Sequence, residues 1–326
     1  MSEDKELILS TKPYAKEIRA KSWYHLLSTL LVCVPVIYMV LEVDILWIRS
    51  LASVFLGLLI VRIFVIYHDY CHNSIFQKSP VADVFFKLFG LYILAPKSIW
   101  KRSHDYHHKN NCKLYTSSIG SYKIITKEKY LTLSKKERFI YMFERHPLTI
   151  LFGYFFVFIF GMSFLSFYRN PSKHWDSLVA LFLHASIAVL IFFFYSWGGL
   201  IFAFLIPNLI ACALGAYLFY AQHNFPGVTF NDKDGWTYVG AAMQSSSFMR
   251  LNRFLNWVTA NIGYHHIHHL NSRIPFYRLP EAFDSMPELQ GAKTTSLSVS
   301  EIIRCLQLKV WDPQKQKMIT HQEIFS

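Results

Sequence analysis

Residues Asn261–Leu270 read NIGYHHIHHL and place four histidines within five positions, at His265, His266, His268 and His269. A helix returns to the same face every three or four residues, so His265, His268 and His269 project from one side and can converge on one point. Neutral imidazole is the commonest protein ligand for zinc, copper, iron and nickel. The stretch is therefore either a metal site or a histidine-rich surface turn, and the rest of the chain bears on that choice.

Histidines also gather at three earlier places along the chain. The motifs are HDYCH with His68 and His72, WKRSHDYHH with His104, His107 and His108, and AQHNFPG with His223. The two histidines of the first motif are four residues apart and share a helical face, and the second motif repeats the spacing of the opening stretch. His223 taken alone is equally compatible with a helix-end histidine that bonds a carbonyl.

The composition of the chain indicates a membrane protein. Of its 326 residues, 53% are hydrophobic, 17% aromatic and only 17% charged, whereas a soluble domain has about 25% charged residues. The net charge of +12 indicates a basic cytoplasmic face rather than binding to nucleic acid, because positively charged loops stay inside. The five cysteines contain no CxxC pair, which favours a reduced, cytosol-facing active region.

Long uncharged runs predict about four transmembrane helices in an all-α membrane bundle. A helix needs about 20 apolar residues to cross the hydrocarbon layer. Runs at 24–41 and 45–67 meet this length, and the uncharged stretch 177–220 is long enough for two crossings, at 177–197 and 200–220. Gly198 and Gly199 at its middle predict a tight helical hairpin.

Two further apolar segments, 81–95 and 147–168, are expected to be embedded without crossing. The first is short and interrupted by Asp83 and Lys87, and the second is flanked by cations at both ends, which suits two cytosolic ends. The last two histidine motifs share a face only if the chain crosses an even number of times between His108 and His265. We therefore expect a cytosolic tail at 1–23, a membrane domain at 24–283, a cytosolic segment at 284–326, and both termini inside.

The histidines are too numerous for a single ion. Those of HDYCH, WKRSHDYHH and NIGYHHIHHL supply eight candidate ligands, nine with His223, whereas zinc takes four and octahedral iron six, so two metals are expected. Asp69 and Asp105 each follow a histidine and are expected to orient imidazoles through their other ring nitrogen. Paired irons with dioxygen suit the oxidation of an apolar, lipid-like substrate, whereas zinc has no redox chemistry.

The motifs HDYCH, WKRSHDYHH, QHNFPG and NIGYHHIHHLNSRIPFYRLP, in this order and at these places relative to the apolar runs, resemble the membrane fatty acid desaturase family. The likeness covers roughly residues 24–283 and is nearest to acyl-lipid desaturases of the Δ12 or ω6 type. It implies a di-iron site, dioxygen as co-substrate, and insertion of a cis double bond into a fatty acyl lipid or thioester. Electrons would come from a separate donor of the ferredoxin or cytochrome b5 type with its reductase.

Residue by residue, the resemblance carries the ligand role to nine histidines. They are His68, His72, His104, His107, His108, His223, His265, His268 and His269. His266 occupies a variable position of the last motif and is left out. Asn261, taken as one helical turn before His265, is a candidate for a water-mediated contact. Cys71 is judged structural, because on a helix it points about 100° away from His72.

Two other functions remain open at this point. A hydroxylase, ketolase or alkane monooxygenase could use the same di-iron head, and motif spacing does not separate it from a desaturase, although SRIPFYRLP resembles the acyl-lipid desaturase branch. A metal transporter would place polar ligands in the middle of its spans. Here the histidine motifs lie at span ends and only His184 falls deep within one, which disfavours transport.

Overall fold

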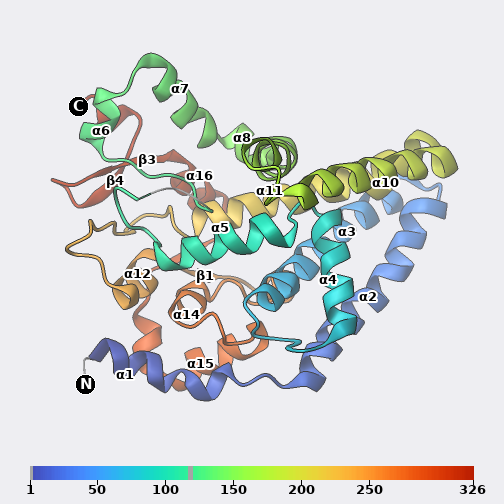
Figure 1. The fold of residues 1–326 in the computed structure, drawn as a ribbon, viewed down its shortest axis with the longest axis horizontal. Coiled ribbons are helices and arrows are strands. Elements are labelled where there is room, and N and C mark those ends of the chain that lie inside the picture. Colours follow the sequence, from blue (N-terminus) through green and yellow to red (C-terminus); the bar gives the residue numbers. More distant parts are fainter. Residues whose placement is uncertain (1–2, 117–119) are drawn as a thin grey trace.

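Long apolar helices extend to one side of the molecule, and the histidine-bearing segments lie at their opposite ends (Figure 1). This computed structural model describes residues 3–116 and 120–326. Both marked termini lie on the side of the histidine-bearing segments (Figure 1). The predicted 1–23 tail is largely helical, with α1 (Glu3–Ser10), the 3-10 helix η1 (Lys12–Ala15) and the first turn of α2, while residues 1–2 lie outside the described part.

Among the described residues, three helices are long and apolar enough to cross a membrane. They are α2 (Arg19–Glu42), α3 (Leu46–Cys71) and the stretch Trp175–Ala221. The last consists of α10 (Trp175–Gly199), a π-helical segment η3 (Leu200–Leu205) and α11 (Ile206–Ala221). These helices cover the four runs that were predicted to span the membrane.

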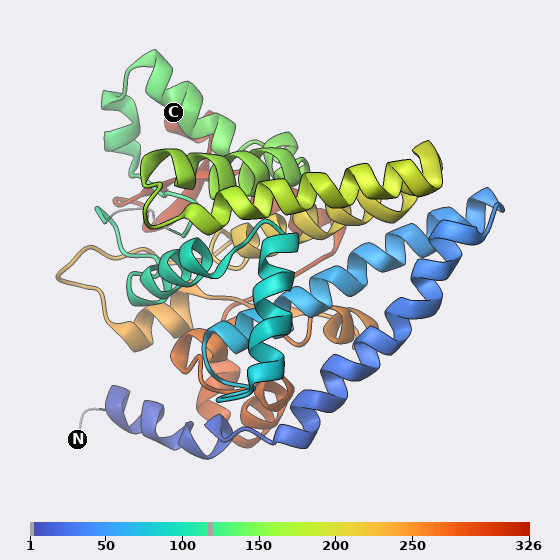
Figure 2. The same cartoon turned by 45° about the vertical axis from the view of Figure 1, so that its right-hand side comes forward.

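The helices α10 and α11 run back along each other as a hairpin (Figure 2). The backbone breaks from the helix at Ser196, whose φ of 54° and ψ of −159° are not helical. The prediction had the turn at Gly198 and Gly199, and Gly199 is instead helical, with φ −61°. Glycine is needed there for space, because a Cβ on Gly199 would lie 2.2 Å from the Cβ of Tyr195. The two glycines thus mark close packing beside the turn rather than the turn itself.

The segments expected to be embedded without crossing are helical as well. The second is built from α8 (Pro147–Leu151), the π-helical η2 (Tyr154–Leu165) and α9 (Ser166–Arg169). Figure 1 views this segment almost along its axis, whereas α10 runs across the picture. The first segment is α4 (Pro80–Tyr92), capped by the Ser79 side chain, and it exposes Val81, Val84 and Leu88 along one face.

Close helix packing brings the histidine-bearing ends together. α3 and α11 touch at Gly57, where a Cβ would lie 2.9 Å from the Pro207 carbonyl oxygen and from the Ile210 Cβ. His68 and His72 therefore lie near His223, which follows α11. The remaining histidines belong to α5 (Lys97–Lys109) and α14 (His265–Leu270), and α12 (Tyr238–Ser245) and α13 (Arg253–Val258) lie between α11 and α14 in sequence.

The part of the chain that the structure describes is mainly helical but not all-α, because it contains four short strands in two small sheets. β1 (Phe248–Arg250) pairs in parallel with β2 (Thr294–Ser296), and β3 (Leu308–Asp312) pairs antiparallel with β4 (Lys317–Thr320). These strands have three to five residues, which is too short for an alternating pattern to be recognised in the sequence. Between these two pairs of strands lies helix α16 (Val299–Gln307), which Ser298 caps by accepting from the Glu301 N–H.

A small lobe combines residues from two distant parts of the chain. It contains α6 (Lys127–Thr132), α7 (Lys135–Glu144), β3, β4 and the 3-10 helix η6 (Gln322–Ile324). Its separate core consists of Ile125, Tyr130, Tyr141, Val310, Ile319 and Ile324. Residues 284–326 are thus not a detached segment, since Trp311 N–H donates to the Ile125 carbonyl. The other short elements are η4 (Phe276–Arg278), α15 (Leu279–Ser285) and η5 (Pro287–Gly291).

Candidate metal centre

All nine histidines proposed as ligands come together in two groups. Within each group, one potential ligand atom per residue lies within 4.8 Å of all the others. The first group is His68, His72, His104, His108 and His268, and the second is His107, His223, His265 and His269. Four segments far apart in the sequence therefore build two adjoining sites.

Helix geometry explains how the histidines of α5 and α14 divide between the groups. Positions i and i+4 are about 40° apart around a helix, whereas i+3 lies about 60° to the other side. On α14, His265 and His269 accordingly enter the second group, while His268 enters the first. The expectation that these three histidines converge on one point is therefore wrong. On α5 the same spacing sends His107 to the second group.

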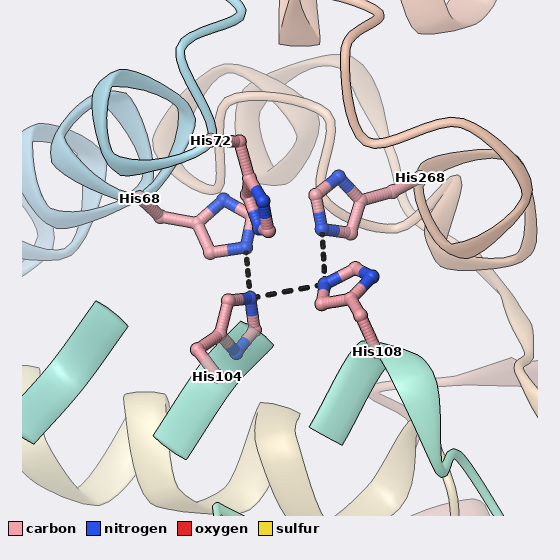
Figure 3. Close-up of side chains that lie close together, drawn as sticks. All are labelled: His68, His72, His104, His108 and His268. Carbon is pink, nitrogen blue, oxygen red and sulfur yellow. Dashed lines mark hydrogen bonds between the residues drawn. The ribbon is translucent and has the colours of Figure 1, made fainter. Parts of the chain in front are cut away.

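The first group is held by α3, α5 and α14 and points its rings toward a common space (Figure 3). The Nε2 atom of His104 lies 2.8 Å from that of His68 and 3.1 Å from that of His108. The Nε2 atoms of His268 and His108 are also 3.1 Å apart. The His72 ring packs against the other four, with centroids 4.6–4.9 Å away.

The second group has the same construction. His223 Nε2 lies 3.1 Å from His107 Nε2 and 2.9 Å from His265 Nε2, and His265 Nε2 lies 3.1 Å from His269 Nε2. The two groups adjoin where the rings of His108 and His269 stack with centroids 4.2 Å apart. The two groups are therefore in direct contact through a pair of stacked imidazoles.

The protonation state of this centre suits metal binding. Burial lowers the pKa of His223 to about 4 and the pKa of His104, His107 and His265 well below the usual value, with neighbouring imidazoles adding to the effect in the last three. These four rings are therefore neutral at pH 7, which is the form that ligates a metal. His223 Nδ1 faces the Ser245 carbonyl at 3.0 Å, which leaves Nε2 with a lone pair toward its group. A nitrogen-only donor set of this kind fits two redox-active ions such as iron.

Asp69 occupies the place expected for a residue that orients a ligand. Its Oδ1 lies 3.2 Å from His68 Nδ1, and its Oδ2 accepts the backbone N–H of Phe276 at 2.7 Å. Asn261 helps to hold Phe276, the residue whose N–H Asp69 accepts, because the Asn261 Nδ2 donates to the Phe276 carbonyl at 3.1 Å. The expected helical turn from Asn261 to His265 is wrong: Asn261 has φ 57° and precedes α14 in a turn.

Asp105 does not orient a histidine. Its carboxylate pairs with Lys101 at 2.8 Å on the half-exposed face of α5, and the structure gives it no histidine partner among the described residues. The physical reason is exposure: Asp105 lies on the partly exposed face of α5 beside Lys101, whereas Asp69 is buried next to His68. His266 also lies outside both groups, as expected, and its Nε2 faces the Leu289 carbonyl at 3.0 Å.

The residues that flank His223 explain the QHN motif. Gln222 donates through Nε2 to the Ile262 carbonyl at 2.8 Å, and Asn224 donates through Nδ2 to the Cys305 carbonyl at 2.7 Å. Asn224 Oδ1 also accepts from the buried guanidinium of Arg145 at 2.6 Å. Both neighbours of His223 are thus bonded to distant parts of the chain, which fixes the direction of the imidazole.

Two aromatic contacts of the centre were missed in the sequence. The Trp100 ring stacks on His104 with centroids 5.0 Å apart, and Phe219 approaches His107 at 5.0 Å. Helical spacing carries a signal for both, because each lies four residues before a histidine of a motif, Trp100 before His104 and Phe219 before His223. Buried Trp100 and half-buried Phe219 restrict the access of water to the imidazoles on this side.

Comparison with known proteins places this centre in context. The family model described as fatty acid desaturase matches residues 45–298. The chain is 29% identical over 288 residues to a fatty acid desaturase of Bacillus subtilis, covering 88% of this chain and 81% of that protein. It is 25% identical over 277 residues to an sn-1 oleoyl-lipid 12-desaturase of Anabaena variabilis, with 84% and 78% covered. An sn-1 acyl-lipid omega-3 desaturase (ferredoxin) of Nostoc is 25% identical over 251 residues, with 72% and 66% covered.

Proposed function

This chain belongs to the membrane fatty acid desaturase family, and on that premise we propose that it introduces a cis double bond into the acyl chain of a membrane lipid. The observation that carries the proposal is the pair of buried histidine groups at the inner ends of apolar helices. Overall, the reaction removes one hydrogen atom from each of two adjacent methylene carbons. With dioxygen, two electrons and two protons, the products are the alkene and two water molecules.

We propose that the two histidine groups hold two iron ions. Bound there, the irons would supply the activation of dioxygen that breaking an unactivated C–H bond requires. The protein's part is to direct Nε2 lone pairs inward, and the contacts of His68 with Asp69 and of His223 with Ser245 support this role. Burial of every proposed ligand except the half-buried His223 also limits the access of water to the centre.

The substrate is proposed to be an acyl lipid, desaturated at the Δ12 or ω6 position. The apolar surface of α2, α3 and the α10–α11 hairpin supports access from the bilayer. The relative named as an oleoyl-lipid 12-desaturase supports the position. The aromatic side chains beside the histidines, Trp100 and Phe219, would give an acyl chain an apolar surface next to the centre.

Electrons are proposed to come from a separate donor, ferredoxin or a cytochrome b5 type protein, with its reductase. The relative whose name includes ferredoxin supports such a donor. We further propose that the helices cross four times, with the histidine groups and both termini in the cytosol. The position of both termini on the histidine side of the molecule supports this topology (Figure 1). A reporter fused after Lys173 should map to the cytosolic side.

Expression in a host that makes only saturated and monounsaturated lipids tests the function. With donor and iron supplied, lipid mass spectrometry should show new acyl chains that have lost two hydrogen atoms, with the second double bond at the Δ12 position. Acyl chains that gain one oxygen atom instead would identify a hydroxylase. No change in the lipids of an iron-loaded preparation would overturn the proposal.

A further inference from the structure

We propose that helix α7 lies on the surface of the bilayer and inserts Phe139, Ile140 and Phe143 among the lipid acyl chains. This region follows the WKRSHDYHH motif and is polar in overall composition, so the sequence gives no hint of a membrane contact. The proposal concerns how the lobe is anchored and goes beyond the desaturation reaction.

The first observation is the apolar outer face of α7. Phe139 is 70% exposed, Ile140 45% and Phe143 40%, while Tyr141 on the opposite face is buried in the core of the lobe. Spacings of one, three and four residues place the three exposed side chains on one side of the helix. A capping box between Ser134 and Glu137 fixes where α7 begins. The helix is therefore amphipathic, with an uncovered apolar stripe.

The second observation is that this stripe continues into the apolar segment of α8, η2 and α9. The Phe143 ring meets the exposed Phe156 ring edge-on with centroids 5.3 Å apart. Stacked and exposed rings then follow at Phe160, Phe164 and Tyr168. One row of aromatic side chains thus runs from the polar lobe to the segment with the membrane-like composition, and a single apolar medium would cover all of it.

The third observation is the charge at both ends of the row. Lys135 and Lys136 stand at the start of α7, and Arg169 and Lys173 follow the last stacked ring. All four are exposed, and none forms an ion pair with another residue in the described part of the chain. Basic residues beside an apolar stripe suit a bilayer that contains anionic lipids. We therefore infer that lipid, rather than a protein, covers this face.

The anchored helix connects directly to the metal centre. Arg145, the residue after α7, is buried and donates to Asn224 Oδ1 at 2.6 Å and to the Tyr220 hydroxyl at 3.2 Å. Asn224 is the neighbour of His223. A bilayer contact through α7 would thus hold the lobe against the end of α11 that presents His223.

Photocrosslinking in vesicles of phosphatidylcholine and phosphatidylglycerol tests this contact with the full-length chain. Benzoylphenylalanine replaces Phe139 in one variant and Phe143 in another, and mass spectrometry detects lipid adducts after illumination. Replacement of Phe325, which is 61% exposed and follows η6 in the same lobe, is the matched control. Replacement of Phe193, 77% exposed on α10, gives the yield expected of a lipid-facing position.

We expect lipid adducts at positions 139 and 143 at a yield near that of position 193 and several-fold above that of position 325. Crosslinks to a second copy of the chain, or yields equal to that of position 325, would overturn the proposal. The measurement requires neither iron nor turnover. Failure of the lipid contact is therefore distinguishable from failure of the proposed desaturase activity.

Discussion

At the scale of single residues, the role of each histidine follows from the direction in which a helix turns it. His268 and His266 are two positions apart on α14, but His268 faces the first group and His266 faces the Leu289 carbonyl. Both are buried, so burial alone does not separate a proposed ligand from a structural histidine. The group that faces Nε2 separates the two: other imidazoles in His268, and a backbone carbonyl in His266.

Replacements of these two histidines should differ in their effect on bound iron. His268→Ala removes a proposed ligand, and we expect loss of activity and of bound iron. His266→Ala leaves the Leu289 carbonyl unpaired and should destabilise the fold by about 1–3 kcal/mol while iron is retained. Iron content and thermal unfolding of each purified variant measure the two effects. Equal iron loss in both would show that the cluster has been divided wrongly.

The two aspartates provide a matched pair of substitutions. Asp69→Asn weakens the contact with His68 and the acceptance of the Phe276 N–H, and we expect a loss of about 10–100-fold in activity or iron affinity. Asp105→Asn changes only a half-exposed pair with Lys101 and should leave both unchanged. Iron titration of the two variants tests this difference in iron affinity. A similar loss for Asp105→Asn would contradict the assignment.

At the scale of elements, helix ends and turns place the histidines. α3 and α11 approach closely at Gly57 and present their histidines from neighbouring C-terminal ends. The hairpin that leads to α11 depends on one residue, Ser196, in a backbone region that favours glycine, with φ 54° and ψ −159°. The turn therefore stores strain that another residue would relieve.

Substitution with glycine should act oppositely at two serines of α10. Ser196→Gly relieves the strained conformation and is expected to stabilise the protein by about 1 kcal/mol. Ser186→Gly lies in the helical interior of α10 and should destabilise it by about 1 kcal/mol. Thermal unfolding in detergent micelles compares the two with the unmodified chain. A shift of the same sign in both would argue against a strained turn.

At the scale of the whole molecule, the proposed metal centre joins segments that are distant in sequence. α3, α5, the end of α11 and α14 each contribute ligating nitrogens to the groups. Bound iron would therefore act as a crosslink between four parts of the fold. Its removal should affect global stability rather than one loop.

Chelation of iron should lower the midpoint of thermal unfolding, because an ion bound only by the folded state stabilises that state. Acid should act in the same direction. Burial holds the pKa of His223 at about 4 in the folded chain, against about 6.5 when unfolded, so the unfolded state binds more protons between these values. The free energy of unfolding should thus fall as the pH drops from about 6.5 toward 4. Melting curves of chelated and iron-loaded protein over this range test both effects.

Much of this fold is readable from the sequence, because its causes are local. Uncharged runs long enough to span a bilayer predicted the positions of α2, α3, α10 and α11. The histidine spacings predicted which side chains gather, because i, i+3 and i+4 positions share a helical face. Predicting these features requires only the helical repeat and the free-energy cost of burying charge.

Tertiary structure decided how those side chains divide and which neighbours support them. Asp69 and Asp105 both follow a histidine, but α3 is covered on all sides near its end while α5 has a free face, so only Asp69 meets an imidazole. β1 pairs with β2 at Phe248 and Thr294, and in the lobe Thr126 forms a β-bridge with Trp311; both contacts join segments far apart in the sequence and so have no local signature. In NIGYHHIHHL, the helical repeat brings three histidines to one side, whereas the packing of α14 against its neighbours assigns them to two sites.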